Sequence, residues 1–154
     1  MEYVFSTKIG NLKIKTEKGE IVSLSLSDEK VSENKIKEKL VQSAINQLDE
    51  YFEGKRTTFS LPLNPKGTPF QKRVWKELIK IPYGKTVSYQ QIAENLGNKN
   101  LTRAVGGANN KNPIIILIPC HRVIGKNGNL TGFACGVDIK EKLLKLEKTK
   151  VLYF

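Results

Sequence analysis

The feature that most constrains the fold is a change in the spacing of apolar residues, which first alternate and later follow helical spacing. Within residues 3–26, three short segments alternate, and turn residues separate them at 10–11 and at 17–20. A period of two predicts strands with one buried face, and short turns predict antiparallel neighbours. The start of the chain is therefore predicted to be a three-stranded antiparallel meander.

A helix is predicted next, because apolar residues recur at spacings of three and four from Ile36 to Phe52. Ser32 is suited to cap the start of this helix, and Gly54 is suited to end it. Residues 55–67 contain Pro62, Pro65 and Gly67, which predict a linker. We therefore expect a sheet-and-helix domain with its linker over 1–67 and a second domain over 68–154.

The second domain is predicted to be mainly helical. Capping-box patterns begin at Thr68, Ser88 and Asp138, and each predicts the start of a helix. Another short helix is predicted over 101–109, close behind Gly97, and two short helices joined by a tight turn predict a helix-turn-helix.

A hairpin beside these helices is predicted to form a wing, because Val123-Ile124 precedes an Asn-Gly turn at 127–128 and then Leu130. The apolar run 114–118 predicts a buried strand or extended segment. The expected fold class is α+β, with a small N-terminal antiparallel three-stranded sheet and a helix, joined to a mainly helical C-terminal domain with a winged helix-turn-helix.

Charge and composition limit the partners. The chain has 26 Lys and Arg against 15 Asp and Glu, which either favours nucleic acid or only keeps the protein soluble. No apolar run approaches membrane-spanning length, and the first residues do not resemble a signal peptide, so we expect a cytoplasmic protein without a membrane partner. Two Cys and one His predict neither a disulfide framework nor a metal site.

The helix at 101–109 has an unusual composition, because Gly106 and Gly107 each cost about 1 kcal/mol relative to Ala. Such a helix, bearing the single cation Arg103, would let a DNA groove approach the backbone closely. Tight packing against another helix is the alternative explanation for the two glycines.

Cys120 is the candidate nucleophile, since a reactive thiolate needs a base or cation nearby and His121 follows it directly. In a strand the two side chains would point to opposite faces, whereas in a turn both could serve one site. The pair suits acyl transfer or alkyl transfer, and a core cysteine beside a surface histidine is the alternative.

The stretch 118–123, Ile-Pro-Cys-His-Arg-Val, resembles the active-site signature of the O6-alkylguanine-DNA alkyltransferases, also called methylated-DNA–protein-cysteine methyltransferases. The resemblance is strong over 68–150, and over 1–54 it extends only to a similar pattern of strands and helix. Further matches occur in the family's order at 70–75, 81–84, 88–89, 103–108, 112–113, 131–133, Lys140, 143–144 and Glu147.

The resemblance implies a monomeric DNA-repair protein that flips O6-alkylguanine out of double-stranded DNA and transfers the alkyl group irreversibly to Cys120 by SN2 displacement. This reaction would occur in a single turnover and without a cofactor. His121 would take the thiol proton through a bridging water, and Glu147 would orient His121. Asn112 would fix the loop before the apolar run, and Tyr89 would rotate the target phosphate near the alkylated oxygen.

The resemblance also implies DNA-binding and substrate-pocket residues. Arg103 would fill the gap left by the extruded base. The remaining DNA-binding residues would be Tyr89, Thr102, Ala104, Gly106 and Gly107, and the pocket residues would be Pro119, Val123, Phe133 and Ala134. Cys135 departs from the family pattern and is interpreted as a small apolar filler.

Structural alternatives exist for several of these residues. Tyr89 would be a packing ring, Glu147 a solvated helix residue, Asn112 an ordinary turn residue, and Arg122 the partner of an acid near Cys120. Two other functions also compete. A non-catalytic alkyltransferase-like winged-helix binder would lack the acceptor cysteine, and a thiol hydrolase would need an oxyanion hole that nothing in the sequence specifies.

Overall fold

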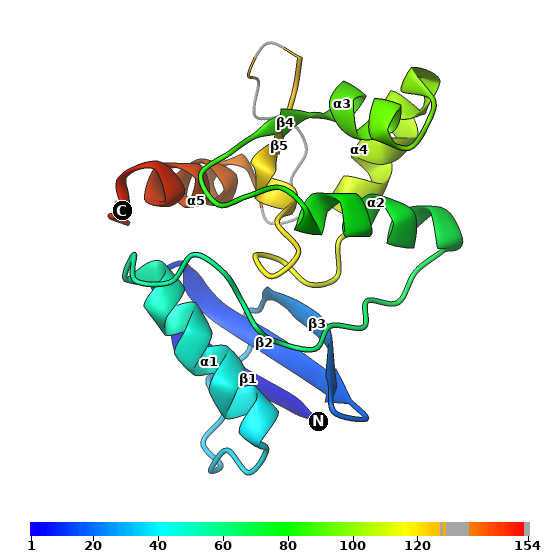
Figure 1. Ribbon diagram of the computed structural model, residues 1–154. Helices are drawn as coiled ribbons and strands as arrows, with labels where there is room; N and C mark the ends of the chain where they lie inside the picture. Colours follow the sequence, from blue (N-terminus) through cyan, green and yellow to red (C-terminus); the bar gives the residue numbers. More distant parts are fainter. Residues whose placement is uncertain (127, 129–135, 153–154) are drawn as a thin grey trace.

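The computed structural model describes residues 1–126, 128 and 136–152. Residues 2–26 form a sheet that packs with one helix, and most of the helices gather in the second half of the chain (Figure 1). This arrangement confirms the predicted α+β fold class. We call residues 1–67 the N-terminal unit and residues 68–154 the C-terminal unit. None of the described helices is long and apolar enough to cross a bilayer.

The N-terminal sheet is the predicted meander. Strands β1 (Glu2–Thr7), β2 (Gly10–Glu17) and β3 (Glu20–Leu26) pair antiparallel in the order β1-β2-β3. Leu12 of β2 lies opposite Phe5 of β1 and Leu26 of β3, so one face of the sheet is apolar. This face packs against helix α1 and forms part of the core.

Helix α1 spans Lys39–Phe52 and begins seven residues after the predicted cap. The prediction for Ser32 is wrong, because its hydroxyl accepts a hydrogen bond from the backbone N–H of Val4 at 3.0 Å. Its own N–H donates to the carbonyl of Val4 at 2.9 Å, so Ser32 is held beside β1. The predicted end is confirmed, since Gly54 follows the helix with a φ of 75°.

The linker is extended and returns along the sheet. The backbone N–H of Ile21 in β3 donates to Pro62, and the N–H of Asn64 donates back to Ile21. This exchange gives the linker one parallel bridge to β3, between Ile21 and Leu63. The linker therefore runs along the β3 edge of the sheet before it enters the C-terminal unit (Figure 1).

The C-terminal unit contains helices α2 (Pro69–Ile79), α3 (Tyr89–Asn95), α4 (Thr102–Asn110) and α5 (Val137–Thr149). The capping box of Thr68 is complete, and the hydroxyl of Ser88 accepts from the N–H of Gln91. The cap predicted at Asp138 is wrong. Helix α5 begins at Val137 with Gly136 as its N-cap, two residues before the predicted cap, and Asp138 lies in its first turn.

The helix-turn-helix consists of α3 and α4, joined by the 3-10 turn Lys99–Leu101. Strand β5 (Val123–Ile124) pairs in parallel with the short strand β4 (Val87–Ser88), a pairing that the sequence did not predict. Of the predicted wing, Gly128 of the turn is described: it has a φ of 78°, and its N–H donates to the carbonyl of Gly125 at 2.9 Å. Residues 127 and 129–130, which include the return strand, lie outside the described residues.

The apolar run 114–118 is buried, as predicted, but it is not a regular strand. Ile114 forms a single bridge with Leu24 of β3, and Ile116 has a φ of 70° that turns the chain back. The run therefore packs the two units together and delivers the chain to Cys120. Buried apolar residues from both units form one continuous cluster around it.

Candidate active site

A single 3-10 turn, Cys120–Arg122, carries the candidate nucleophile and its two neighbours. Pro119 precedes the turn, and the N–H of Arg122 donates to its carbonyl at 3.0 Å. Cys120 and His121 are fully buried, and Arg122 is 6% exposed. Because the backbone turns instead of extending, adjacent residues are not forced to opposite faces.

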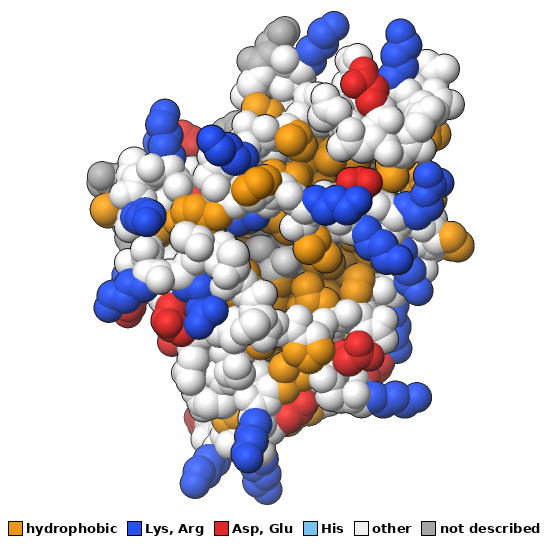
Figure 2. All heavy atoms as spheres, in the orientation of Figure 1, with side chains coloured by type: hydrophobic (Ala, Val, Ile, Leu, Met, Phe, Trp, Pro, Cys, Tyr) orange, Lys and Arg blue, Asp and Glu red, His pale blue; other side chains and the backbone are white. Residues whose placement is uncertain are grey.

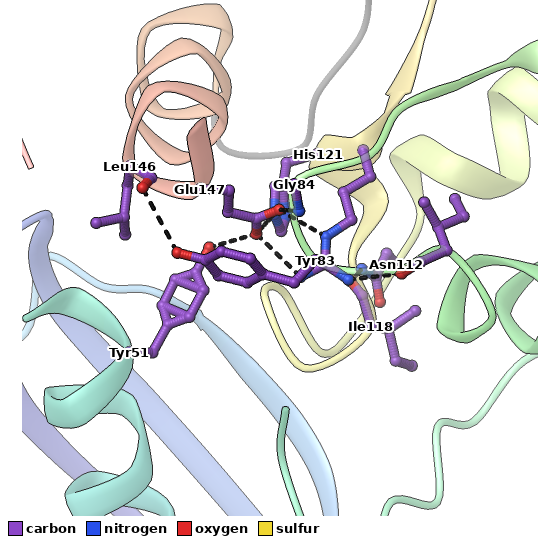
Figure 3. Close-up of polar contacts among 10 residues, drawn as sticks. Tyr51, Tyr83, Gly84, Asn112, Ile118, His121, Leu146 and Glu147 are labelled. Carbon is purple, nitrogen blue, oxygen red and sulfur yellow. Dashed lines mark hydrogen bonds and ion pairs between the residues drawn. The ribbon is translucent and has the colours of Figure 1, made fainter. Parts of the chain in front are cut away.

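The imidazole of His121 is held by the carboxylate of Glu147, which projects from α5. The His121 Nε2 and Glu147 Oε2 atoms are 2.5 Å apart (Figure 3). A carboxylate accepts hydrogen bonds, so this contact assigns the ring proton to Nε2. The Nδ1 atom then presents a lone pair, and it has no hydrogen-bond partner among the described residues.

Burial lowers the pKa of His121, and the positive charges of Arg122 and Lys140 lower it further. The hydrogen bond and negative charge of Glu147 act in the opposite direction without overcoming burial. His121 is therefore neutral near pH 7 and can act as a base through Nδ1.

Arg122 and Glu147 form a two-pronged ion pair. Nε of Arg122 donates to Oε1 at 2.8 Å, and Nη2 donates to Oε2 at 3.0 Å. Its third nitrogen, Nη1, donates to the carbonyl of Ile81 at 2.7 Å. Arg122 is thus the partner of an acid near Cys120. The sequence analysis gave this role as the structural alternative for Arg122.

Two more donors complete the surroundings of Glu147. The N–H of Gly84 donates to Oε1 at 3.1 Å, and the hydroxyl of Tyr51 donates to Oε2 at 2.7 Å. Burial alone would raise the pKa of Glu147. The hydrogen bonds and positive charges of His121 and Arg122 outweigh burial and hold the pKa well below its usual range. Glu147 is thus a buried, ionised residue, and the alternative of a solvated helix residue is wrong.

Asn112 ties together the two ends of the loop that precedes the nucleophile. Its Nδ2 donates to the carbonyl of Ile118 at 2.8 Å, and its Oδ1 accepts from the N–H of Ile114 at 3.0 Å. Asn109, on the buried face of α4, donates from Nδ2 to the carbonyl of Cys120 at 3.3 Å. Helix α4 is therefore bonded directly to the turn that carries Cys120. The sequence analysis missed Asn109, although a polar residue on an otherwise buried helix face is a signal for such a contact.

Tyr89 lies at the start of α3 and contacts Lys140 of α5. The Nζ atom of Lys140 lies 3.4 Å from the hydroxyl of Tyr89 and 5.6 Å from the centre of its ring. Lys140 is fully buried, and burial lowers its pKa, whereas the negative charge of a Cys120 thiolate acts in the opposite direction. Lys140 therefore lies within electrostatic reach of both Tyr89 and Cys120. The sequence analysis noted Lys140 only as a family match and assigned it no role.

Apart from Tyr89, which lies on α3, the predicted DNA-binding residues lie on α4. Arg103, Ala104 and Gly107 are exposed, whereas Thr102 and Gly106 are half-buried. A methyl group added at either glycine would meet no described atom within 4 Å. Tight packing against another described helix therefore does not explain the two glycines.

Of the four predicted substrate-pocket residues, the structure describes two, Pro119 and Val123, and these two do not line the same opening. Pro119 lines a pocket of about 590 Å³ between the end of α2 and the linker, on a face with an apolar hollow (Figure 2). Val123 is fully buried in the core, and Phe133 and Ala134 lie outside the described residues, as does Cys135. Among the described residues, no three His, Cys, Asp or Glu side chains cluster as metal ligands would.

Comparisons with known proteins agree with this geometry. Residues 2–65 match the ribonuclease-like domain of 6-O-methylguanine DNA methyltransferase, and residues 69–149 match the DNA binding domain of the same family. A methylated-DNA–protein-cysteine methyltransferase from Methanosarcina barkeri is 57% identical over 113 residues, covering 73% of this chain and 72% of that protein. The constitutive methylated-DNA–protein-cysteine methyltransferase of Bacillus subtilis is 47% identical over 152 residues, covering 92% of each.

A solved structure is similar over nearly the whole chain. The Mycobacterium tuberculosis OGT in complex with DNA superimposes with a TM-score of 0.88 at 39% identity, covering 98% of this chain and 94% of that one. The similarity therefore includes both the sheet with its helix and the helical unit.

Proposed function

Because this chain belongs to the 6-O-methylguanine DNA methyltransferase family, it is a DNA-repair methyltransferase, and we propose that Cys120 is the residue that receives the alkyl group. The observation that carries this proposal is that Cys120 shares one buried turn with His121, whose ring is held by Glu147. The partner would be double-stranded DNA that carries O6-alkylguanine.

His121 acts as the base for the thiol of Cys120. The thiol proton passes from Sγ to Nδ1 of His121 through a bridging water, and Glu147 stabilises the resulting imidazolium from the other side of the ring. The positive charge of Lys140 favours the thiolate. Proton transfer over this short relay produces the nucleophile inside a buried site.

The thiolate displaces guanine from the alkyl carbon in one SN2 step. The S–C bond forms as the C–O6 bond breaks, and the bonding electron pair leaves with the guanine oxygen. The Tyr89 hydroxyl supplies a proton to the guanine, and a backbone N–H would stabilise the leaving guanine by donating a hydrogen bond. No cofactor is required, because the substrate carries both the alkyl group and the leaving group. The thioether is not cleaved afterwards, so each protein molecule reacts once.

Helix α4 contacts the DNA. The target alkyl group lies within stacked bases, so the nucleotide must be flipped out at a cost of a few kcal/mol. The exposed Arg103 enters the duplex and offsets part of this cost by stacking in the gap. One chain carries both the relay and the recognition helix, which supports action as a monomer. In a prokaryotic cell, the location of this activity would be the cytoplasm, which contains the chromosome.

The test is transfer of label from a duplex with one O6-methylguanine. We expect one labelled methyl group per protein molecule, located on Cys120 by peptide mapping. Cys120→Ala should capture none, whereas the matched control Cys135→Ala should react normally. Label on Cys135, or repeated turnover that releases label to water, would contradict the proposal.

The competing functions predict other outcomes. A non-catalytic alkyltransferase-like protein would bind the duplex without capturing label, and the presence of Cys120 argues against it. A thiol hydrolase would leave the modified duplex unchanged.

A further inference from the structure

Helix α1 of the N-terminal unit contributes a side chain to the proton relay of the C-terminal unit. The hydroxyl of Tyr51 donates to Oε2 of Glu147 at 2.7 Å, across 96 positions of sequence. Tyr51 is fully buried, and its pKa is raised well above the usual value by burial and by the nearby negative charge of Glu147. It therefore remains a protonated phenol and can only donate to this carboxylate.

Tyr51 and His121 share the same acceptor atom. Oε2 of Glu147 accepts from Tyr51 at 2.7 Å, from Nε2 of His121 at 2.5 Å and from Arg122 at 3.0 Å (Figure 3). A donor that withdraws negative charge from Oε2 leaves less of it to stabilise a protonated His121. The hydroxyl of Tyr51 is thus positioned to influence how strongly His121 holds its proton.

The ring of Tyr51 is fixed by aromatic neighbours, so the hydroxyl has little freedom to leave Glu147. It meets Phe52 and Tyr83 edge-on at 5.5 and 6.1 Å between ring centres, and it lies 5.5 Å from Phe59 of the linker. Three of these four rings belong to residues 51–59 of the N-terminal unit. The packing of this unit therefore determines the position of the donor.

We propose that Tyr51 is a positioning residue of the relay, which holds the Glu147 carboxylate and lowers the pKa of His121 by sharing its acceptor oxygen. The N-terminal unit would thus take part in the chemistry as well as in stability. The inference rests on the proposed function only where it connects this pKa to the rate of alkyl transfer.

The experiment is an NMR titration of His121, the only histidine in the chain, so its ring signals need no assignment among several histidines. Tyr51→Phe removes the hydroxyl and keeps the ring. We expect the pKa of His121 to rise by roughly half a unit to one unit, because one of the hydrogen bonds that compete for the carboxylate is lost. The pH at which alkyl transfer reaches half its maximal rate should rise by a similar amount.

Tyr83→Phe is the matched control. The hydroxyl of Tyr83 lies beside the same helix but donates to the carbonyl of Leu146 at 3.5 Å, not to Glu147. We expect little change in the His121 titration for this variant. An unchanged titration in Tyr51→Phe, or equal shifts in both variants, would overturn the proposal.

A measurement on the unaltered protein keeps the proposal testable if Tyr51→Phe does not fold. A buried phenol bonded to a carboxylate should give a downfield hydroxyl proton signal that exchanges slowly and lies close to the His121 ring. Absence of this signal would refute the contact. Neither NMR experiment uses alkylated DNA, so failure of the proposed function would appear separately, as unlabelled Cys120 in the wild-type transfer assay.

Discussion

The Nε2 atom of His121 and the Oε2 atom of Glu147 lie 2.5 Å apart, although 26 positions separate the two residues in the sequence. The contact joins the turn of Cys120, the candidate nucleophile, to α5, and the 3-10 geometry at Cys120 allows the ring to reach the acid. The same carboxylate also accepts hydrogen bonds from Arg122, Gly84 and Tyr51. The Glu147 side chain therefore connects α5 to three separate parts of the fold.

Glu147→Gln should slow alkyl transfer by roughly 100-fold or more, since the imidazolium would lose its stabilising charge and general-base catalysis commonly contributes that much. The variant should also lose about 3–5 kcal/mol of unfolding free energy, because Arg122 would keep a buried charge without its partner. Single-turnover transfer rates and urea unfolding measure the two effects. A variant with normal rate and normal stability would rule out the relay.

Stability should fall in acid. The pKa of Glu147 is held below its unfolded value, so its contribution is present above about pH 4.5 and is lost as the pH falls toward the folded-state pKa. The lowered pKa of His121 also reduces stability in acid, beginning as the pH falls through about 6.5. The reason is that the imidazole binds a proton more readily in the unfolded chain than in the folded protein. Urea unfolding between pH 8 and pH 3 measures this slope, and stability that stayed constant down to pH 3 would contradict it.

The rate of alkyl transfer should also fall in acid, but for a different reason. A protonated His121 cannot accept the thiol proton, so the rate should decline as the pH drops through the lowered pKa of this residue. The midpoint is expected below 6.5. Single-turnover rates with free O6-benzylguanine across this range measure the effect without DNA binding, and a midpoint above 6.5 would be inconsistent with a buried neutral base.

Gly107→Ala should separate stability from DNA binding. The glycine is exposed and an added methyl group meets nothing, so removing a helix-interior glycine should stabilise the protein by about 0.5–1 kcal/mol. If DNA lies against α4, the same methyl group should weaken duplex binding by roughly 1–3 kcal/mol, the usual cost of an extra methyl group in a close contact. Thermal melting and duplex titration measure the two effects.

Gly54→Ala is the control for that prediction. Gly54 has a φ of 75°, and an added methyl group would lie 2.3 Å from the carbonyl oxygen of Lys150, so this variant should lose stability. If Gly107→Ala bound the duplex with unchanged affinity, the duplex would not lie against this part of α4.

Arg103→Ala should slow repair of duplex DNA while leaving reaction with free O6-benzylguanine nearly unchanged. The side chain is exposed, so its loss should alter stability by less than about 0.5 kcal/mol. Comparison of the two single-turnover rates tests the role in base flipping, and equal losses on both substrates would contradict it. Duplex affinity should also weaken with added salt if lysines of this basic chain contact the phosphates.

Much of the fold could be predicted because its signals are local. Alternation over 3–26 determined the three strands, and the residues around Thr68 and Ser88 determined two helix starts. The start of α1 could not be predicted, because Ser32 bonds to Val4 instead of capping the helix, and that partner is 28 positions away. The positive φ of Ile116 could not be predicted either, because β-branched residues rarely adopt a positive φ without support from the surrounding packing.

The candidate site, like the fold, could be predicted from the sequence only in part. The sequence by itself predicted which residues carry the chemistry, because the types and spacing at Cys120 and His121, with Glu147 downstream, match one family's pattern. Only the tertiary structure decided that Tyr51 and Gly84 also donate to Glu147 and that Lys140 lies near Cys120. Caps and alternation depend on neighbours within a few positions, whereas the surroundings of a buried charge are assembled from distant segments by packing of the whole core.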